Sequence, residues 1–286
     1  MAVRTVADTL SQSGDTFSRD DDPELVRDAV PFALKTYESL LESIPKHEGL
    51  LLATCSGFTQ YSYAFIQTDS DLVESTDYEA ALRLKDRALK LYLRGRGYCV
   101  RLLELRRPGV EEKLRVDPGN ALAWASRDDV PVLYWTGAAW GAAISIGLDR
   151  PDLVSDLPAV KALMERVLAL QEDYSRGAVH AIMISLEALP EAMGGSKERA
   201  RRHFQRAVEL SDGQDPGPFV TLAASVALPA QNRDEFVKLL GQALAIDPDS
   251  NPSARLAAII AQKRARHLLS RVDELFDTTA SQEDRR

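Results

Sequence analysis

The feature that most constrains this chain is a run of 19 residues, 130–148, that contains no charged side chain. Asp129 precedes the run and Asp149 follows it. Pro131 suits the first position of a helix, because its missing N–H is not needed there. Gly137 and several neighbouring alanines leave much of the helix surface bare, so that a second helix can approach closely. A helix of this kind requires protein on most sides, or a ligand on one.

The same run is long enough to cross a membrane, since a helix rises about 1.5 Å per residue. Acidic residues flank both of its ends, however, and no excess of Lys or Arg sets an orientation. Thr, Ser, Gly and Trp also dilute its hydrophobicity, and similar uncharged runs recur along the chain. We therefore predict a buried helix of a soluble protein rather than a membrane span.

Uncharged runs alternate with charged amphipathic segments along the whole chain, and alternation with a period of two is almost absent. This order predicts an all-α fold, a TPR-like array of helical hairpins that forms a right-handed solenoid with degenerate repeats. Ala33, Tyr37 and Pro45 have the spacing of a tetratricopeptide repeat (TPR). We expect one domain over residues 20–276, a flexible leader over 1–19 and a polar tail over 277–286.

The composition argues against several classes of function. A net charge of −8 and the lack of a basic stripe with interleaved aromatics argue against nucleic acid as a partner. The four histidines have no metal-ligand spacing, and His180 is expected to be a satisfied core residue rather than a base. No catalytic residue, metal or cofactor is predicted.

Cys55 and Cys99 are interpreted as free buried thiols, although a disulfide remains possible from the sequence.

Aromatic side chains in the uncharged runs are the candidate binding residues. In helical-hairpin arrays the first helix of each pair lines the concave face, so that face is expected to be apolar and to accept an apolar ligand or a partner helix. The alternative is that these residues belong to the core. The candidates for a ligand channel or a partner site are Tyr61, Phe65, Tyr134, Trp135 and Trp140.

Several long stretches resemble signature segments of the T component of TPR-associated TRAP transporters, the TatT family. They are residues 49–66, 133–145 and 189–196, together with the segments 20–27 and 265–276. The resemblance covers roughly residues 20–276.

The resemblance implies a non-enzymatic, periplasmic, helical protein that forms a homotrimer. It also implies a partner, the extracytoplasmic substrate-binding subunit of a tripartite ATP-independent (TRAP) transporter, and a channel for apolar ligands. Family members usually begin with a signal peptide and a lipidated cysteine, and this sequence shows neither. Lipid anchoring is therefore expected only for a full-length precursor. The remaining alternatives are a generic TPR adaptor that binds a peptide and, with no supporting cluster of acid and base groups, an α-helical enzyme.

Overall fold

The computed structural model describes residues 5, 7–9 and 14–276, and no strand occurs among them. The prediction of an all-α fold is confirmed, whereas the arrangement as a TPR-like solenoid stays a prediction. The helices group into two compact units, one up to Tyr174 and one from Ser175 onward. Each unit is described separately below. Among the described residues, none of the helices combines the length and the apolar character that a bilayer crossing demands.

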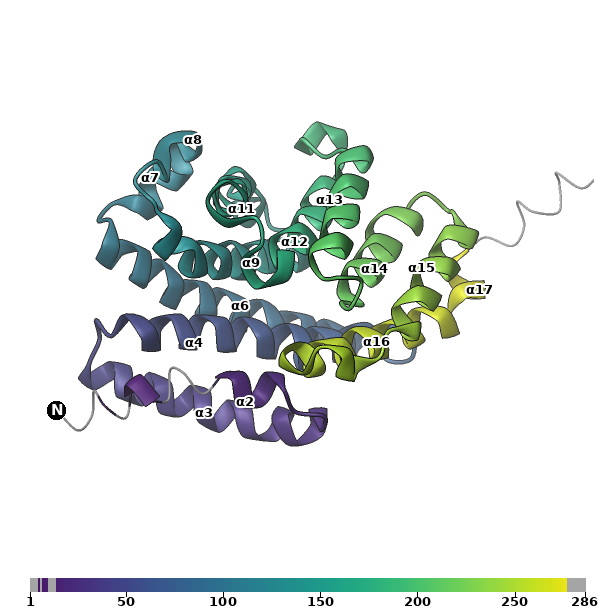
Figure 1. Cartoon of the computed structure of the whole chain (residues 1–286), viewed down its shortest axis with the longest axis horizontal. Coiled ribbons are helices and arrows are strands. Elements are labelled where there is room, and N and C mark those ends of the chain that lie inside the picture. Colours follow the sequence, from purple (N-terminus) through teal and green to yellow (C-terminus); the bar gives the residue numbers. More distant parts are fainter. Residues whose placement is uncertain (1–4, 6, 10–13, 277–286) are drawn as a thin grey trace, which may run out of the picture. The chain divides into compact units, whose positions relative to one another are not determined.

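Unit 1 is built around long helices that run side by side (Figure 1). Its elements are α2 (Gly14–Ser18), α3 (Pro23–Ser43), α4 (Glu48–Tyr61), the π-helical turn η1 (Ser62–Gln67), α5 (Thr68–Val73), α6 (Tyr78–Arg106), α7 (Val110–Val116), α8 (Pro118–Ala121), the 3₁₀ turn η2 (Arg127–Asp129), α9 (Val130–Ile146), α10 (Pro151–Val154) and α11 (Leu157–Gln171). Helix α6 packs against both α4 and α9, and α11 packs against α9.

Residues 110–121, which follow α6, form α7 and α8, with Val110 and Leu114 buried. One segment of unit 1 differs from the sequence expectations. Within the expected flexible leader, Gly14–Ser18 is helical and Ala7 is fully buried. The rest of the leader and the expected tail 277–286 lie largely outside the described residues. Asp22 caps α3 by accepting hydrogen bonds from the N–H groups of Glu24 and Leu25, as its sequence context predicts.

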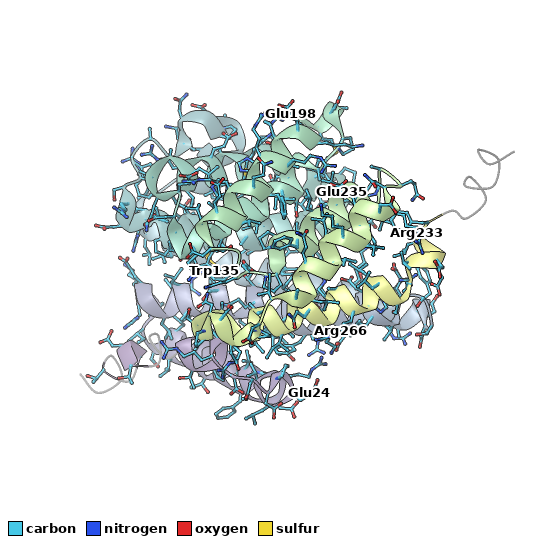
Figure 2. The ribbon with its side chains drawn as sticks, turned by 45° about the vertical axis from the view of Figure 1, so that its right-hand side comes forward. Glu24, Trp135, Glu198, Arg233, Glu235 and Arg266 are labelled. Atoms are coloured by element: carbon cyan, nitrogen blue, oxygen red, sulfur yellow. A yellow bond between two sulfur atoms is a disulfide. The ribbon has the colours of Figure 1, made fainter. Side chains whose placement is uncertain are left out.

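Unit 2 consists of shorter helices (Figure 2). They are α12 (Ala178–Glu187), the 3₁₀ turn η4 (Glu191–Met193), α13 (Lys197–Leu210), α14 (Gly217–Leu222), the π-helical turn η5 (Ala223–Ala227), α15 (Arg233–Ala245), the 3₁₀ turns η6 (Pro248–Ser250) and η7 (Pro252–Ala254), α16 (Arg255–Ser270) and α17 (Val272–Leu275). Its core includes Phe236 and Leu240 of α15, both fully buried. Arg201 of α13 pairs through two hydrogen bonds with Glu235 of α15, which is labelled in Figure 2.

A strained turn, the 3₁₀ segment η3 (Tyr174–Gly177), precedes α12. Ser175, Arg176 and Gly177 all have positive φ values, 48°, 57° and 84°. Such a conformation is unfavourable for the first two, which have a Cβ atom. The Arg176 guanidinium donates hydrogen bonds to the Ser211 carbonyl and to Asp212, and these bonds hold the turn in place.

A disulfide joins Cys55 of α4 to Cys99 of α6, with Cα atoms 5.5 Å apart. The interpretation of the two cysteines as free thiols is therefore wrong, and the alternative left open by the sequence is correct. Sequence spacing could not decide between them, because only the packing of α4 on α6 brings the two side chains together. Both cysteines are fully buried, so the bond cross-links the centre of unit 1.

Gly95 is the position at which α6 lies closest to α4. A Cβ atom added there would lie 3.1 Å from the Cys55 carbonyl oxygen and 3.2 Å from the Phe58 Cβ. Gly97, two residues later, has no neighbour within 4 Å of an added Cβ. The two glycines of the same helix therefore have different roles.

We predict that Gly95→Ala lowers the free energy of unfolding by about 1–3 kcal/mol, because the α4 backbone must move away. Gly97→Ala is the matched control and should be neutral or stabilising by up to about 1 kcal/mol, since alanine is the better helix former. Urea denaturation of both variants measures the difference. Equal effects of the two substitutions would contradict the close contact.

We also predict that the Cys55→Ala/Cys99→Ala variant is less stable than the oxidised protein. The bond spans 44 residues, and closing a loop of that length corresponds to about 4 kcal/mol in the chain-entropy model. Denaturation of the oxidised protein and of the double variant tests this value. A variant as stable as the wild type would show that the bond contributes nothing to the fold.

Candidate functional site

Helix α9 carries three of the five predicted binding residues, and its small side chains determine how it packs. A Cβ added at Gly137 would lie 2.2 Å from the Met164 Cε and 3.3 Å from the Leu163 Cβ, both on α11. One added at Gly141 would lie 3.3 Å from Val160 of the same helix. The bare surface of α9 is therefore occupied by α11, while α4 and α6 pack on its other sides. The prediction of a buried helix surrounded by protein is confirmed.

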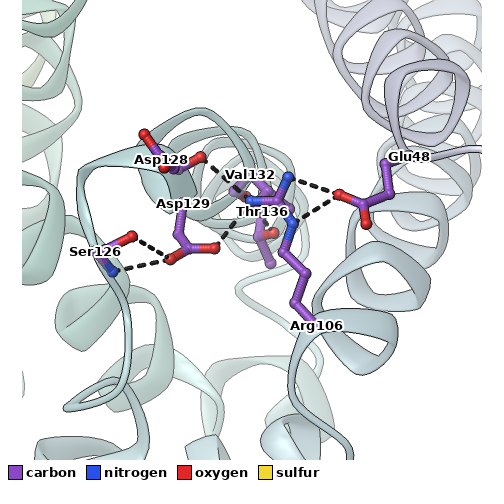
Figure 3. Close-up of polar contacts among 7 residues, drawn as sticks. All are labelled: Glu48, Arg106, Ser126, Asp128, Asp129, Val132 and Thr136. Atoms are coloured by element: carbon purple, nitrogen blue, oxygen red, sulfur yellow. Dashed lines mark hydrogen bonds and ion pairs between the residues drawn. The ribbon is translucent and has the colours of Figure 1, made fainter.

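Arg106 fixes the start of α9 relative to α4 and α6 (Figure 3). Its guanidinium donates to Glu48 Oε2 through Nη2 at 2.8 Å and to Asp129 Oδ1 through Nη1 at 2.9 Å. Glu48 begins α4 and Asp129 immediately precedes α9, so both carboxylates lie near the positive end of a helix dipole. Arg106 is the last residue of α6, where a cation is favoured.

The Asp129 carboxylate is buried, and both of its oxygens accept hydrogen bonds. Its Oδ2 accepts hydrogen bonds from the Ser126 backbone N–H at 2.8 Å and from the Ser126 hydroxyl at 3.0 Å. Burial alone would raise the pKa of Asp129, but the bonds from Ser126 and Arg106 outweigh it, and the pKa lies below its ordinary value. Asp129 is therefore charged at neutral pH and holds α9 in place.

Tyr134 and Trp135 form an aromatic cluster together with Tyr174. The rings of Tyr134 and Trp135 lie 5.1 Å apart in an edge-to-face arrangement, and those of Tyr134 and Tyr174 lie 5.2 Å apart. All three side chains are half-buried, so part of each ring is accessible, and Trp135 is labelled in Figure 2. Burial raises the pKa of Tyr174, partly offset by the hydrogen bond that the Trp135 indole donates to it. We call these three residues the α9 aromatic cluster.

Tyr61 and Phe65 lie at a different place, where α4 passes into η1. Their rings are 5.5 Å apart and both side chains are buried, with Phe65 2% exposed. The Arg27 guanidinium lies 5.2 Å from the centre of the Phe65 ring and pairs with Asp69. This pair is packed in the interior of the unit, as the alternative of a core role predicts for such residues.

Trp140 lies at a third place, a cleft of about 440 Å³. The indole is fully buried beneath the Arg96 guanidinium, which lies 3.8 Å from the ring centre. Glu111 accepts a hydrogen bond from Arg96 and forms an ion pair with Arg115. The cleft is lined by Leu93, Arg96, Arg115, Trp140, Asp152, Leu153, Ser155 and Asp156. Its walls are charged, so it is unsuited to a purely apolar ligand.

The five predicted residues therefore lie at three separate places in unit 1. Of these, only the α9 aromatic cluster presents partly accessible aromatic surface next to an uncharged helix. Sequence reasoning missed Tyr174 and Arg96. No local pattern marks either residue, because each reaches its aromatic partner from a different helix of the chain.

The histidines of unit 2 form a buried contact rather than a metal site. His180 Nδ1 and His203 Nδ1 lie 2.8 Å apart, and His180 is 4% exposed, as a core histidine should be. His203, whose pattern indicates a surface residue, is half-buried, because α12 packs on α13. Burial, together with the neighbouring His180, lowers the pKa of His203 to about 4. In the described part of the chain no group of three or more His, Cys, Asp or Glu residues is arranged to hold a metal ion.

We predict that Arg106→Gln lowers the free energy of unfolding by about 2–3 kcal/mol at pH 7, because the Asp129 carboxylate is left buried with one partner fewer. The pKa of Asp129 is lowered in the folded state, so its contribution is present above pH ~4 and is lost as the pH falls through the folded-state pKa. The difference in the free energy of unfolding between the wild type and the Arg106→Gln variant should therefore become smaller in acid.

Arg107→Gln is the matched control, since Arg107 is exposed and makes no ion pair with any described residue. We expect it to change stability by less than about 0.5 kcal/mol. Denaturation curves at several pH values compare the two variants. If both behave alike, Arg106 does not hold α9.

Comparisons with known proteins agree with this architecture. The chain is 35% identical over 272 residues to an uncharacterised protein of Treponema pallidum (strain Nichols), and the match covers 91% of this chain and 82% of that protein. The family model of the TRAP transporter T-component matches residues 19–276, almost the whole described region. This chain therefore belongs to the TRAP transporter T-component family.

Proposed function

We propose that this protein docks the extracytoplasmic substrate-binding subunit of a TRAP transporter and receives an apolar ligand at the α9 aromatic cluster. Family membership gives it an accessory role in a TRAP system, in association with other subunits of that system, and the family is not one of enzymes. The docking and the passage of a ligand through a helical channel are the parts that we add.

The observation that carries the ligand proposal is the combination of the cluster with its helix. Tyr134, Trp135 and Tyr174 are only partly buried, so part of each ring is accessible, whereas α9 carries no charge over its whole length. The helix that carries the cluster is anchored at its start, because Arg106 pairs with Asp129. A rigid aromatic surface binds apolar groups with little loss of side-chain entropy. Tyr61, Phe65 and Trp140 then support the helices that present it.

The disulfide supports an extracytoplasmic location, which the family also suggests. Disulfides form and persist in oxidising compartments such as the bacterial periplasm and are rare in the cytosol. The Cys55–Cys99 bond lies in the centre of unit 1. We propose that the protein is periplasmic, is anchored by a lipid in its full-length precursor, and assembles as a homotrimer.

We predict that Trp135→Ala weakens the binding of an apolar probe, such as a medium-chain fatty acid, by roughly 10- to 100-fold. The loss of the indole removes apolar contact area at the site itself. Trp135→Phe should retain most of the affinity, since it keeps an aromatic ring at the same position. Isothermal titration calorimetry of folded variants measures both.

Trp124→Ala is the matched control, because Trp124 is also half-buried in unit 1 but belongs to the connection between α8 and η2 and makes no ring contact with the cluster. The affinity of the Trp124→Ala variant for the probe should equal that of the wild type. Equal binding by the Trp135→Ala and Trp124→Ala variants would overturn the assignment of the cluster as the ligand site.

A further inference from the structure

The outer face of α6 carries a row of three cations. Arg83, Arg87 and Lys90 follow one another at intervals of four and three residues, which places them on one face of the helix. All three are exposed. Buried residues such as Ala88 and Tyr92 occupy the opposite face. We call Arg83, Arg87 and Lys90 the α6 basic stripe.

The three cations of the stripe are unpaired among the described residues. Further along α6, Arg94 pairs with Glu38, Arg96 with Glu111 and Arg106 with Glu48. By contrast, no stripe residue makes an ion pair or a hydrogen bond with any residue that the structure describes.

Acidic partners are available for the stripe within α6 itself but are not used. Glu79 lies four residues before Arg83, and Asp86 lies four residues before Lys90, the spacing at which helical ion pairs form. Neither carboxylate is within ion-pair distance of its cation. The cations of the stripe carry like charges at this spacing, so they repel one another slightly. Among the described residues the stripe adds no ion pair to unit 1.

The charge of the whole chain indicates what the stripe attracts. The sequence contains 43 acidic and 35 basic residues, a net charge of −8. Helix α6 reverses this balance, with eight basic residues against three acidic ones. An acidic partner is thus repelled by most of the surface and attracted to the stripe, which steers it to one orientation.

The neighbourhood of the stripe favours a protein partner over a membrane. Tyr78 and Leu82, 61% and 38% exposed, belong to the same end of α6, and protein interfaces are enriched in tyrosine and arginine. Arginine also suits the planar, two-bond recognition of carboxylates.

We propose that the α6 basic stripe is the docking surface for an acidic face of the substrate-binding subunit. This inference rests on the proposed function, which supplies the partner, and it adds the surface and the kind of interaction. Three guanidinium and ammonium groups meet carboxylates of the subunit, and Tyr78 and Leu82 pack at the edge of the contact.

The test is a binding titration with the TRAP substrate-binding subunit of the same organism. The stripe variant is Arg83→Glu/Arg87→Glu/Lys90→Glu, compared with a matched control, Lys46→Glu/Lys113→Glu/Arg127→Glu. The control residues are exposed, lie in unit 1 and are unpaired among the described residues, and the net charge changes by the same amount. Circular dichroism checks that both variants are folded, and the milder variant Arg83→Gln/Arg87→Gln/Lys90→Gln replaces the first if it is not.

We expect the stripe variant to bind the subunit at least about 10-fold more weakly than the wild type, and the control variant to stay within about 3-fold. Wild-type binding should weaken as the salt concentration rises, and that salt dependence should be lost in the stripe variant.

Two other results would overturn the inference in different ways. If the stripe and control variants bind the subunit equally well, the stripe is not the docking surface, while the proposed function stands. If the wild type does not bind the subunit at all, the proposed function fails and the inference fails with it. Binding of the wild type to anionic phosphatidylglycerol vesicles, abolished in the stripe variant while subunit binding is kept, would also overturn it.

Discussion

The absence of side chains along one surface of α9 is the constraint on which the rest of unit 1 depends. A Cβ atom added at Gly137 would meet the Met164 side chain, and one added at Gly141 would lie 3.3 Å from Val160, so the bare positions of α9 let α11 pack close to its backbone. A helix with no charged residue cannot face water over its length, so α4 and α6 cover its remaining sides. Tyr134 and Trp135 keep part of their surface accessible, and these are the side chains we assign to ligand binding.

Polar and covalent links hold this packing in register. Arg106, at the end of α6, donates hydrogen bonds to Glu48 at the start of α4 and to Asp129 at the start of α9. One cation and two carboxylates therefore join the ends of three helices. The Cys55–Cys99 bond joins α4 to α6 at their centre, next to the close approach at Gly95. Disulfides form and persist outside the cytosol, in oxidising compartments. The stability that this bond gives to the helices therefore depends on the compartment in which the protein folds.

The sequence predicted the helices well and the contacts between them poorly. Helix α13 begins directly after Ser196, a residue type that caps helices, and α9 coincides with the uncharged run, because caps and charge patterns are local signals. Which helices become neighbours decides whether the disulfide forms and which aromatic rings Tyr174 and Arg96 contact. Local signals in the sequence do not encode those neighbours. For the same reason the five predicted binding residues, chosen by residue type, lie at three places instead of one.

Native mass spectrometry of the purified protein, alone and mixed with the TRAP substrate-binding subunit, tests directly whether this protein binds that subunit. We predict a closed oligomer that carries the subunit, up to one for each protomer. A monomer that leaves the subunit unbound, while retaining an unrelated peptide, would contradict the proposed function and favour a generic adaptor instead.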